Sequence, residues 1–180
     1  KVNITSKVLV PKTDKPLPIY FRESEMVAFK ELNKIPTYEE EMDKVEWLEA
    51  MRDYLVVELL YQTGVRRAEL AALEDKDIDL VGRQIRVFGK RRKERFVPIG
   101  EKLVKEIEGY MKIKQDLLQG EECFGIFLVR KKKSGEWVTL GAGGIYNTVR
   151  ARMSEVSTLK KHSPHVLRHT FATTMLNNGA

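Results

Sequence analysis

The chain has 180 residues, of which 32 are lysine or arginine and 26 are acidic, so its formal net charge is +6. Hydrophobic residues make up 42% and charged residues 32%, a balance typical of one globular domain rather than a disordered chain. The single cysteine, Cys123, excludes an internal disulfide framework and a multi-cysteine zinc site. The sequence has neither the roughly 18-residue apolar run that a membrane span needs nor a signal peptide. We therefore expect a cytoplasmic protein, and the excess of positive charge favours a polyanionic partner.

The character of the sequence changes after its first 18 residues. Residues 1–18 combine lysines with three prolines and show no hydrophobic period, which indicates an interdomain linker. Apolar residues at helical spacing then predict a helix that begins near Phe21 and ends at Pro36. A second helix is expected from Thr37, with Glu40 as its capping-box partner.

The second helix has a long, broad apolar face. We expect it to break near Met51 or Asp53 before Gly64 ends it. A short helix over residues 66–73 and a polar turn over residues 75–79 should follow.

A β-hairpin comes next. Alternating polar and apolar residues over 84–88 and β-prone residues at 96–99 predict two strands, and the tip between them, residues 89–95, is very basic. The remaining elements are expected to be a helix over 101–118, strands over 124–129 and 137–140, a helix over 145–156, and a final helix from Ser163 (N-cap) and Pro164 (N1) to about residue 178. The fold class is mainly α (α+β), a helical domain with a small antiparallel sheet.

The first candidate site lies at the turn between the second and third helices. Gly64 permits a tight turn, and Arg66 opens the next helix, where the helix dipole disfavours a positive charge. An arginine suits that position when an anion lies close by, held by the guanidinium and the free backbone N–H groups together. Glu69, one turn further on, can hold the guanidinium in place. The alternative is a solvated Arg–Glu pair on a surface helix.

The second candidate site is the tip of the predicted hairpin. Five of its seven residues are basic: Lys90, Arg91, Arg92, Lys93 and Arg95. A two-stranded ribbon fits a DNA groove, and its tip can deliver a lysine to a phosphate. The alternatives are an ordinary charged loop and a basic run like a nuclear-localisation signal.

The third candidate site is the start of the final helix. His165 and Arg168 are three residues apart, so they share a face near a capped N-terminus, a place that suits an anionic substrate. His169 lies four residues from His165, a spacing that also suits a metal pair, but no third ligand accompanies it. The buried stripe of this helix is expected to consist of apolar residues that recur every four positions: Leu167, Phe171 and Met175.

Together these three segments resemble the tyrosine recombinase (phage integrase) family, in particular its bacterial Xer-like branch, over residues 19–180. The resemblance implies the helical catalytic domain of that family. It also implies a set of catalytic residues, with an accessory carboxylate that supports the first arginine: Arg66, Lys90, His165 and Arg168, and Glu69 as the carboxylate.

The hairpin departs from the pattern of the family. A glycine and a small polar residue usually follow the lysine, whereas Arg91 and Arg92 stand there, so Lys93 is an alternative to Lys90 as the catalytic lysine. The resemblance also implies that basic residues beside the site contact DNA: Arg67, Arg91, Arg92, Lys93 and Arg95.

Enzymes of this family use a tyrosine hydroxyl to attack a DNA phosphodiester, which gives a 3′-phosphotyrosyl link and a free 5′-hydroxyl. Two arginines can clamp the charged phosphate oxygens, so the resemblance implies neither a metal nor a nucleotide cofactor. The family places its nucleophilic tyrosine downstream of the His-x-x-Arg helix, and all six tyrosines of this chain precede Arg168. We therefore expect residues 19–180 to be a catalytic domain that stops before its nucleophile and is inactive alone.

The resemblance implies double-stranded DNA as the partner, a homo- or hetero-tetramer on DNA for the full-length protein, and no membrane association. Two other functions remain open. One is a type IB topoisomerase-like enzyme, which uses a similar residue set to relax supercoils. The other is a DNA-binding module without catalytic activity.

Overall fold

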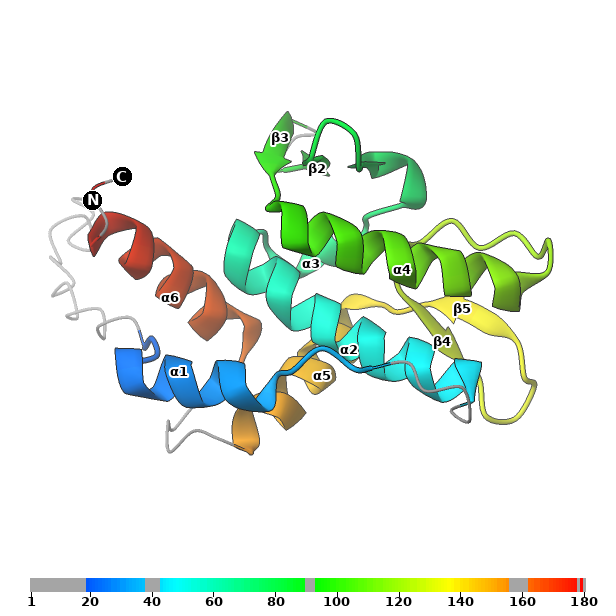
Figure 1. The fold of residues 1–180 in the computed structure, drawn as a ribbon, viewed down its shortest axis with the longest axis horizontal. Coiled ribbons are helices and arrows are strands. Elements are labelled where there is room, and N and C mark those ends of the chain that lie inside the picture. The colour runs from blue at the N-terminus through cyan, green and yellow to red at the C-terminus, as the bar shows by residue number, and fades with distance from the viewer. Residues whose placement is uncertain (1–18, 38–42, 90–92, 156–161, 178, 180) are drawn as a thin grey trace, which may run out of the picture.

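The structure, a computed structural model, describes residues 19–37, 43–89, 93–155, 162–177 and 179 (Figure 1). Its elements are α1 (Glu23–Leu32), α2 (Lys44–Thr63), α3 (Arg67–Ala71), the 3₁₀ turn η2 (Asp75–Asp77), β1 (Ile78–Asp79), β2 (Gln84–Phe88), β3 (Glu94–Pro98), α4 (Glu101–Leu118), β4 (Leu128–Arg130), β5 (Trp137–Thr139), α5 (Ala142–Ser154) and α6 (Pro164–Asn177). The predicted mainly helical fold with a small antiparallel sheet is confirmed. None of the helices within the described residues is long and apolar enough to cross a membrane.

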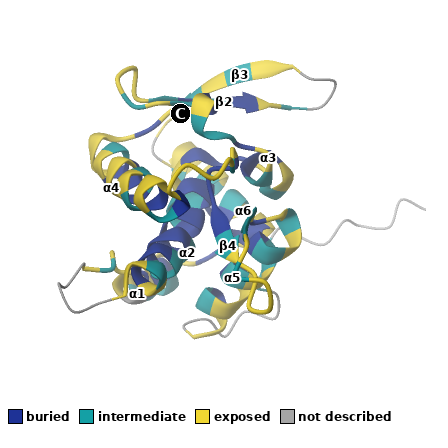
Figure 2. Ribbon diagram, turned by 90° about the vertical axis from the view of Figure 1, so that its right-hand side faces the viewer, coloured by how far each residue is buried: buried dark blue, intermediate teal, exposed yellow. Residues whose placement is uncertain are grey.

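Helix α2 forms the centre of the core, and α4, α5 and α6 pack against it. Its buried residues lie on every side of the helix, as the consecutive run Leu55, Val56 and Val57 illustrates. A helix that is apolar all round is an interior helix. Figure 2 accordingly shows α2 dark blue in the middle of the molecule, with the β2–β3 hairpin at one edge.

The predicted break near Met51 or Asp53 is wrong, because α2 is unbroken over its 20 residues. The polar residues in its middle have partners on neighbouring elements. Arg52 donates to the carbonyl of Leu128 in β4 at 2.9 Å and forms an ion pair with Asp53 at 2.8 Å. Thr148 of α5 donates to the Asp53 carboxylate at 3.3 Å. These polar residues therefore join α2 to β4 and α5 instead of interrupting the helix.

Helix α2 also begins later than predicted. Its N-cap is Asp43, whose carboxylate accepts a hydrogen bond from the backbone N–H of Val45 at 2.9 Å. Thr37 lies outside any helix, and its predicted capping partner Glu40 lies outside the described residues. An aspartate at the N-cap satisfies a free N–H group and complements the helix dipole, which explains the observed start.

Strands β1, β2 and β3 form a three-stranded antiparallel sheet in that order. The register of the β2–β3 hairpin pairs Val87 with Arg95 and Phe88 with Glu94. This hairpin is the predicted one, and residues 90–92 of its tip lie outside the described residues. Val87 is buried and its neighbour Phe88 is exposed, so one face of the hairpin packs on the helices and the other faces solvent.

The strand predicted over 124–129 is too long, because only its last part forms β4. Phe124 is exposed, and Gly125 makes a single isolated bridge. Polar contacts hold this segment instead. The buried Lys114 of α4 donates to both carboxylate oxygens of Asp75, at 2.6 and 2.8 Å, and to the carbonyl of Gly125 at 2.6 Å.

Helix α6 packs against α2, and its Thr170 hydroxyl accepts a hydrogen bond from the backbone N–H of Phe21 at 3.0 Å. Its buried residues are Pro164, Val166, Leu167 and Thr170. The predicted buried stripe of Leu167, Phe171 and Met175 is wrong at its C-terminal end, because Met175 is 43% exposed. Figure 1 shows the reason: the C-terminal end of α6 extends beyond the end of α2, so the stripe leaves the core.

Gly64 forms the corner between α2 and α3. It ends α2 in the left-handed conformation, with φ 59° and ψ 20°. A Cβ atom at this position would lie 2.5 Å from Cδ1 of Phe171 in α6. The turn therefore requires glycine for its backbone angle and for the close approach of the Phe171 ring.

Replacing Gly64 with alanine should lower the free energy of unfolding by about 1–3 kcal/mol, because the backbone is strained and the Phe171 ring is displaced. Gly109→Ala is the matched control. Gly109 lies inside α4, and a Cβ there meets nothing within 4 Å, so this variant should gain about 0.5–1 kcal/mol. Urea unfolding of the three proteins measures both changes. A G64A protein as stable as the wild type would contradict the role given to this corner.

Candidate active site

Arg66 is the N-cap of the short helix α3, and Glu69 closes this turn. The Oε2 atom of Glu69 accepts the backbone N–H of Arg66 at 2.7 Å, and Oε1 accepts from Nη1 of the Arg66 side chain at 2.9 Å. Glu69 thus satisfies a free donor of the helix start, as a capping-box glutamate does, and holds the guanidinium at the same time. The Arg66 side chain is 57% exposed, so part of its guanidinium is accessible to a ligand.

Arg95 of β3 binds the same carboxylate. Its Nη1 donates to Oε1 of Glu69 at 3.1 Å and its Nη2 donates to Oε2 at 2.8 Å. Glu69 therefore accepts four hydrogen bonds, two from each arginine, although its side chain is only 6% exposed. A bidentate arginine–carboxylate pair fixes orientation as well as charge.

These contacts keep Glu69 ionised. Burial alone raises the pKa of Glu69, but hydrogen bonds from the Arg95 side chain and from the backbone and side chain of Arg66 outweigh burial and lower the pKa to about 2. The hydrogen bond to Glu69 in turn raises the pKa of Arg95. At neutral pH the site therefore holds one carboxylate between two guanidinium groups.

Arg168 reaches the same place from α6. It donates from Nη1 to the carbonyl oxygen of Gly64, at the end of α2, where backbone carbonyls lack helical partners. Burial lowers the pKa of Arg168, and the positive charge of Arg66 lowers it further. An anion bound beside Arg66 and Arg168 would offset both effects.

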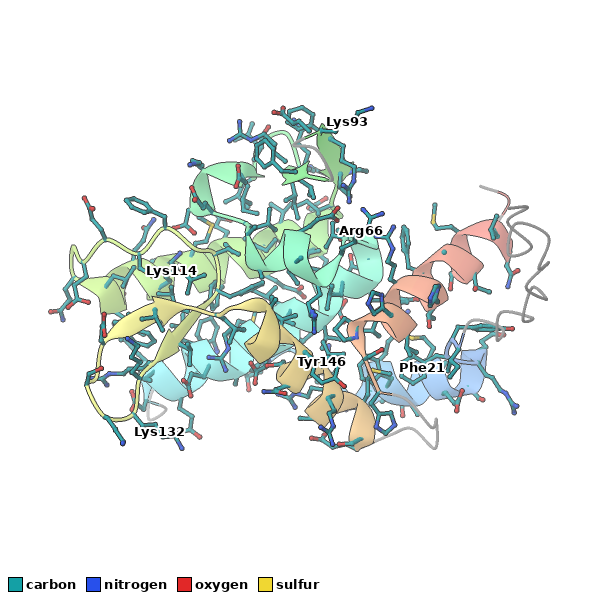
Figure 3. The ribbon with its side chains drawn as sticks, turned by 180° about the vertical axis from the view of Figure 1, so that it is seen from behind. Phe21, Arg66, Lys93, Lys114, Lys132 and Tyr146 are labelled. Carbon is teal, nitrogen blue, oxygen red and sulfur yellow. The ribbon has the colours of Figure 1, made fainter. Side chains whose placement is uncertain are left out.

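Arg66, Arg95 and Arg168 line one shallow pocket of about 390 Å³. The rest of its lining is Thr63, Gly64, Phe171 and Ala172. Figure 3 shows Arg66 where α3, the hairpin and α6 come together. Three guanidinium groups against the single carboxylate of Glu69 leave an excess of about two positive charges, which suits a phosphate-like oxyanion.

The residues singled out in the final helix take different positions. Arg168 lies in the pocket, whereas His165 is exposed in the first turn of α6 and is not among the pocket-lining residues. The catalytic role of His165 stays a prediction. Among the described residues, no group of three or more histidine, cysteine, aspartate and glutamate side chains could hold a metal ion.

The basic residues predicted to contact DNA are also dispersed. Lys93 is exposed at the outer end of the hairpin, on the same side of the molecule as Arg66 (Figure 3). Arg67 lies over the ring of Tyr146 in α5, with its guanidinium carbon 5.5 Å from the ring centre. Three predicted residues lie outside the described residues: Lys90, Arg91 and Arg92.

The contact between Arg95 and Glu69 is the feature of the site that the sequence reasoning missed. The sequence pattern places Arg95 in the hairpin tip, whereas in the structure it lies in β3 and pairs with Val87 of β2. A signal was present, because residues two apart on a strand share a face. Val97 packs against the core, so Arg95 should lie on the inward face as well.

The fold and the site together define a class: a helical domain with an arginine-rich pocket beside a β-hairpin. Over residues 26–180 the sequence matches the model of the phage integrase family. A tyrosine recombinase XerC from Staphylococcus aureus (strain bovine RF122 / ET3-1) is 36% identical over 179 residues, which cover 99% of this chain and 55% of the relative. The chain belongs to the phage integrase family, as predicted from its motifs. It spans about half the length of the curated relatives it matches.

Solved structures share this fold. A crystal structure of XerA recombinase matches with a TM-score of 0.68 and 29% identity, and the match covers 95% of this chain and 53% of that one. A structure of XerH site-specific recombinase bound to difH substrate, in a pre-cleavage complex, matches with a TM-score of 0.67 and 22% identity, covering 91% of this chain and 44% of that one. At that identity, the second match supports the fold alone.

The low pKa of Glu69 predicts a specific dependence of stability on pH. The folded state lowers this pKa from its ordinary value of 4.5 to about 2, so the stabilisation is fully present above pH 4.5 and is lost as the pH falls toward 2. Glu69→Gln should therefore unfold more easily than the wild type at pH 7, and the difference should shrink between pH 4.5 and 2.

Urea unfolding at a series of pH values measures this difference. Glu136→Gln is the matched control, since Glu136 is 59% exposed and pairs with Lys131. An exposed ion pair is worth about 0–1 kcal/mol, so this control should stay close to the wild type at every pH. A constant difference between Glu69→Gln and the wild type would contradict the low pKa of Glu69.

Proposed function

We propose that this protein is a site-specific DNA recombinase, which breaks and rejoins DNA strands through a 3′-phosphotyrosyl intermediate. The observation that carries the proposal is the convergence of Arg66 and Arg168 on one pocket, with Glu69 holding the first arginine. A relative named as a tyrosine recombinase, 36% identical over nearly the whole chain, supports the same function.

In this proposal Arg66 and Arg168 clamp the non-bridging oxygens of the scissile phosphate. Negative charge grows on these oxygens as the tyrosine attacks, so donors aimed at them stabilise the transition state more than the ground state. Both arginines are already held, Arg66 by Glu69 and Arg168 by the carbonyl of Gly64. Less reorganisation is then required when the phosphate reacts.

The other predicted catalytic residues would transfer protons. Lys90, or Lys93 as its alternative, would protonate the leaving 5′ oxygen, since a lysine desolvated against DNA has a lowered pKa. His165 would assist the attacking tyrosine, whose ordinary pKa is near 10. Its exposed position in the first turn of α6 leaves it accessible to a segment or a DNA strand that covers the pocket.

In this proposal the attacking tyrosine comes from outside the described residues. No described tyrosine lines the arginine pocket. Tyr54 and Tyr110 lie in the core, and burial raises the pKa of each hydroxyl, with a hydrogen bond to Glu106 adding to the effect at Tyr54. Tyr146 lies under Arg67 rather than in the pocket.

Double-stranded DNA is the proposed partner, with the basic hairpin against the backbone beside the scissile phosphate. One structural relative, the Tn1549 transposon integrase, was solved in complex with transposon right end DNA, and we extend a DNA partner to this chain. We further propose a homo- or hetero-tetramer on DNA, in the cytoplasm, where bacterial chromosomes lie. A topoisomerase-like activity would use the same pocket, and the names of the relatives favour recombination over it.

Replacing Arg168 with alanine in the natural gene product should slow single-turnover cleavage by about 100-fold or more, because one preorganised donor to the phosphate is lost. The dissociation constant for DNA should change by less than about 5-fold, since many other phosphate contacts remain. A suicide duplex nicked near the cleavage point, followed on a denaturing gel, measures the covalent band. Persistence of cleavage in R168A, or absence of a covalent band with the wild type on its DNA, would contradict the proposed function.

The 180-residue chain alone should bind duplex DNA without forming a covalent adduct. Its binding constant should fall with salt at a slope of about −0.9 per phosphate contact. Arg91→Ala and Lys93→Ala should each reduce that slope by about one unit. Fluorescence anisotropy at several salt concentrations measures the slopes. Slopes equal to the wild type would show that the hairpin tip does not touch the backbone.

A further inference from the structure

We propose that Arg95 is a positioning residue, which fixes the orientation of the Glu69 carboxylate. Through this carboxylate, Arg95 sets the orientation of the Arg66 side chain and the position of the β2–β3 hairpin. The inference rests on the proposed function of the pocket, and it differs from the sequence-based prediction that Arg95 contacts DNA.

The hydrogen bonds at Glu69 are divided between two arginines. Arg95 supplies two of the four, one to each carboxylate oxygen. The carboxylate plane is therefore set by a planar fork, which allows little rotation. Arg66 reaches Glu69 with one side-chain hydrogen bond, from Nη1 to Oε1. The bidentate contact of Arg95 thus fixes the position of Oε1, and the hydrogen bond to Oε1 fixes the position of the Arg66 guanidinium.

Both strands of the hairpin come close to Glu69: Arg95 of β3 binds it, and the end of β2 lies nearby. A Cβ atom at Gly89, at the end of β2, would lie 3.5 Å from Nη1 of Arg95 and 3.7 Å from Oε1 of Glu69. The backbone N–H of Gly89 donates to the carbonyl of Lys93 at 2.8 Å. Gly89, at the end of β2, therefore lies close to the carboxylate that orients Arg66, and Arg95 of β3 binds that carboxylate directly.

Both Nη atoms of Arg95 already donate to Glu69. While it holds this pair, Arg95 can reach a phosphate only through its remaining N–H groups. Its charge still acts on the pocket, because it contributes to the lowered pKa of Arg168, after burial and the charge of Arg66. Arg95 therefore shapes the pocket without being required to touch the DNA.

The first arm of the test needs no DNA chemistry. In the wild-type chain at neutral pH, the side-chain ¹⁵N signals of Arg66 should report slow rotation, because its Nη1 is held by a fixed carboxylate. In Arg95→Ala this rotation should become fast, although Arg66 and Glu69 are unchanged. Arg86→Ala is the matched control: Arg86 of β2 donates from Nε and Nη2 to Asp77 at 3.0 and 2.8 Å. The Arg86→Ala variant loses a similar ion pair of the hairpin, and its Arg66 signals should be the same as in the wild type. Unchanged Arg66 signals in R95A would overturn the proposal.

The second arm measures cleavage and DNA affinity in the natural gene product. Arg95→Ala should slow single-turnover cleavage by about 10- to 100-fold, as small misplacements of catalytic groups do, with an unchanged salt slope of DNA binding. Arg95→Lys keeps the charge but not the fork, so it should remain slow. In a Glu69→Gln background, Arg95→Ala should add little further loss, because the two residues act through one contact. Arg86→Ala should cleave as the wild type does.

The other outcomes each overturn the proposal. Full activity in Arg95→Lys would mean that charge alone matters, and a salt slope reduced by about one unit in Arg95→Ala would mean a phosphate contact. Equal slowing in Arg86→Ala would mean that any hairpin ion pair has the same effect. If the wild type itself does not cleave DNA, the proposed function fails, while the Arg66 signals still decide whether Arg95 orients Arg66.

Discussion

The Glu69 carboxylate lies at the point where α3, the β2–β3 hairpin and the arginine pocket meet. It is buried, it caps the start of α3 through the backbone of Arg66, and it joins two arginines from distant parts of the chain. Isolated in the interior, such a carboxylate would be costly, and only its four hydrogen bonds make the ionised form stable. The same contacts leave a surplus of positive charge on the pocket side, so one residue stabilises the local fold and prepares a site for an anion.

A second constraint brings in α6. The left-handed turn at Gly64 ends α2, leaves its carbonyl accessible to Arg168, and allows the Phe171 ring to pack against the corner. The two arginines proposed to clamp the phosphate thus belong to elements held at one corner of the buried helix α2. Fixing groups on packed helices and a paired strand keeps them in place before the substrate arrives, which is where electrostatic catalysis gains most.

Much of this could be predicted from the sequence, for identifiable reasons. The hairpin strands and the helix over 101–118 have clear periodicity, and the Arg66–Glu69 spacing of three residues already implied a contact on one helix turn. The predictions were wrong where contacts with residues distant in sequence determine the local structure. A break was expected near Met51 or Asp53, but Arg52 and Asp53 have partners in β4 and α5 that are distant in sequence. Met175 fits the helical stripe, but it is exposed because the C-terminal end of α6 extends beyond the end of α2. Arg95 looked like part of a charged tip, since its partner Glu69 lies 26 residues away.

The Glu69–Arg95 pair is proposed to hold Arg66 so that it and Arg168 can share one oxyanion. The most direct measurement is a crystal structure of the chain soaked in sulfate. We expect a sulfate with oxygens roughly 2.7–3.2 Å from guanidinium nitrogens of both Arg66 and Arg168, while Arg95 keeps both hydrogen bonds to Glu69. A structure in which Arg95 leaves Glu69 to bind the sulfate, or in which sulfate binds only outside this pocket, would contradict it.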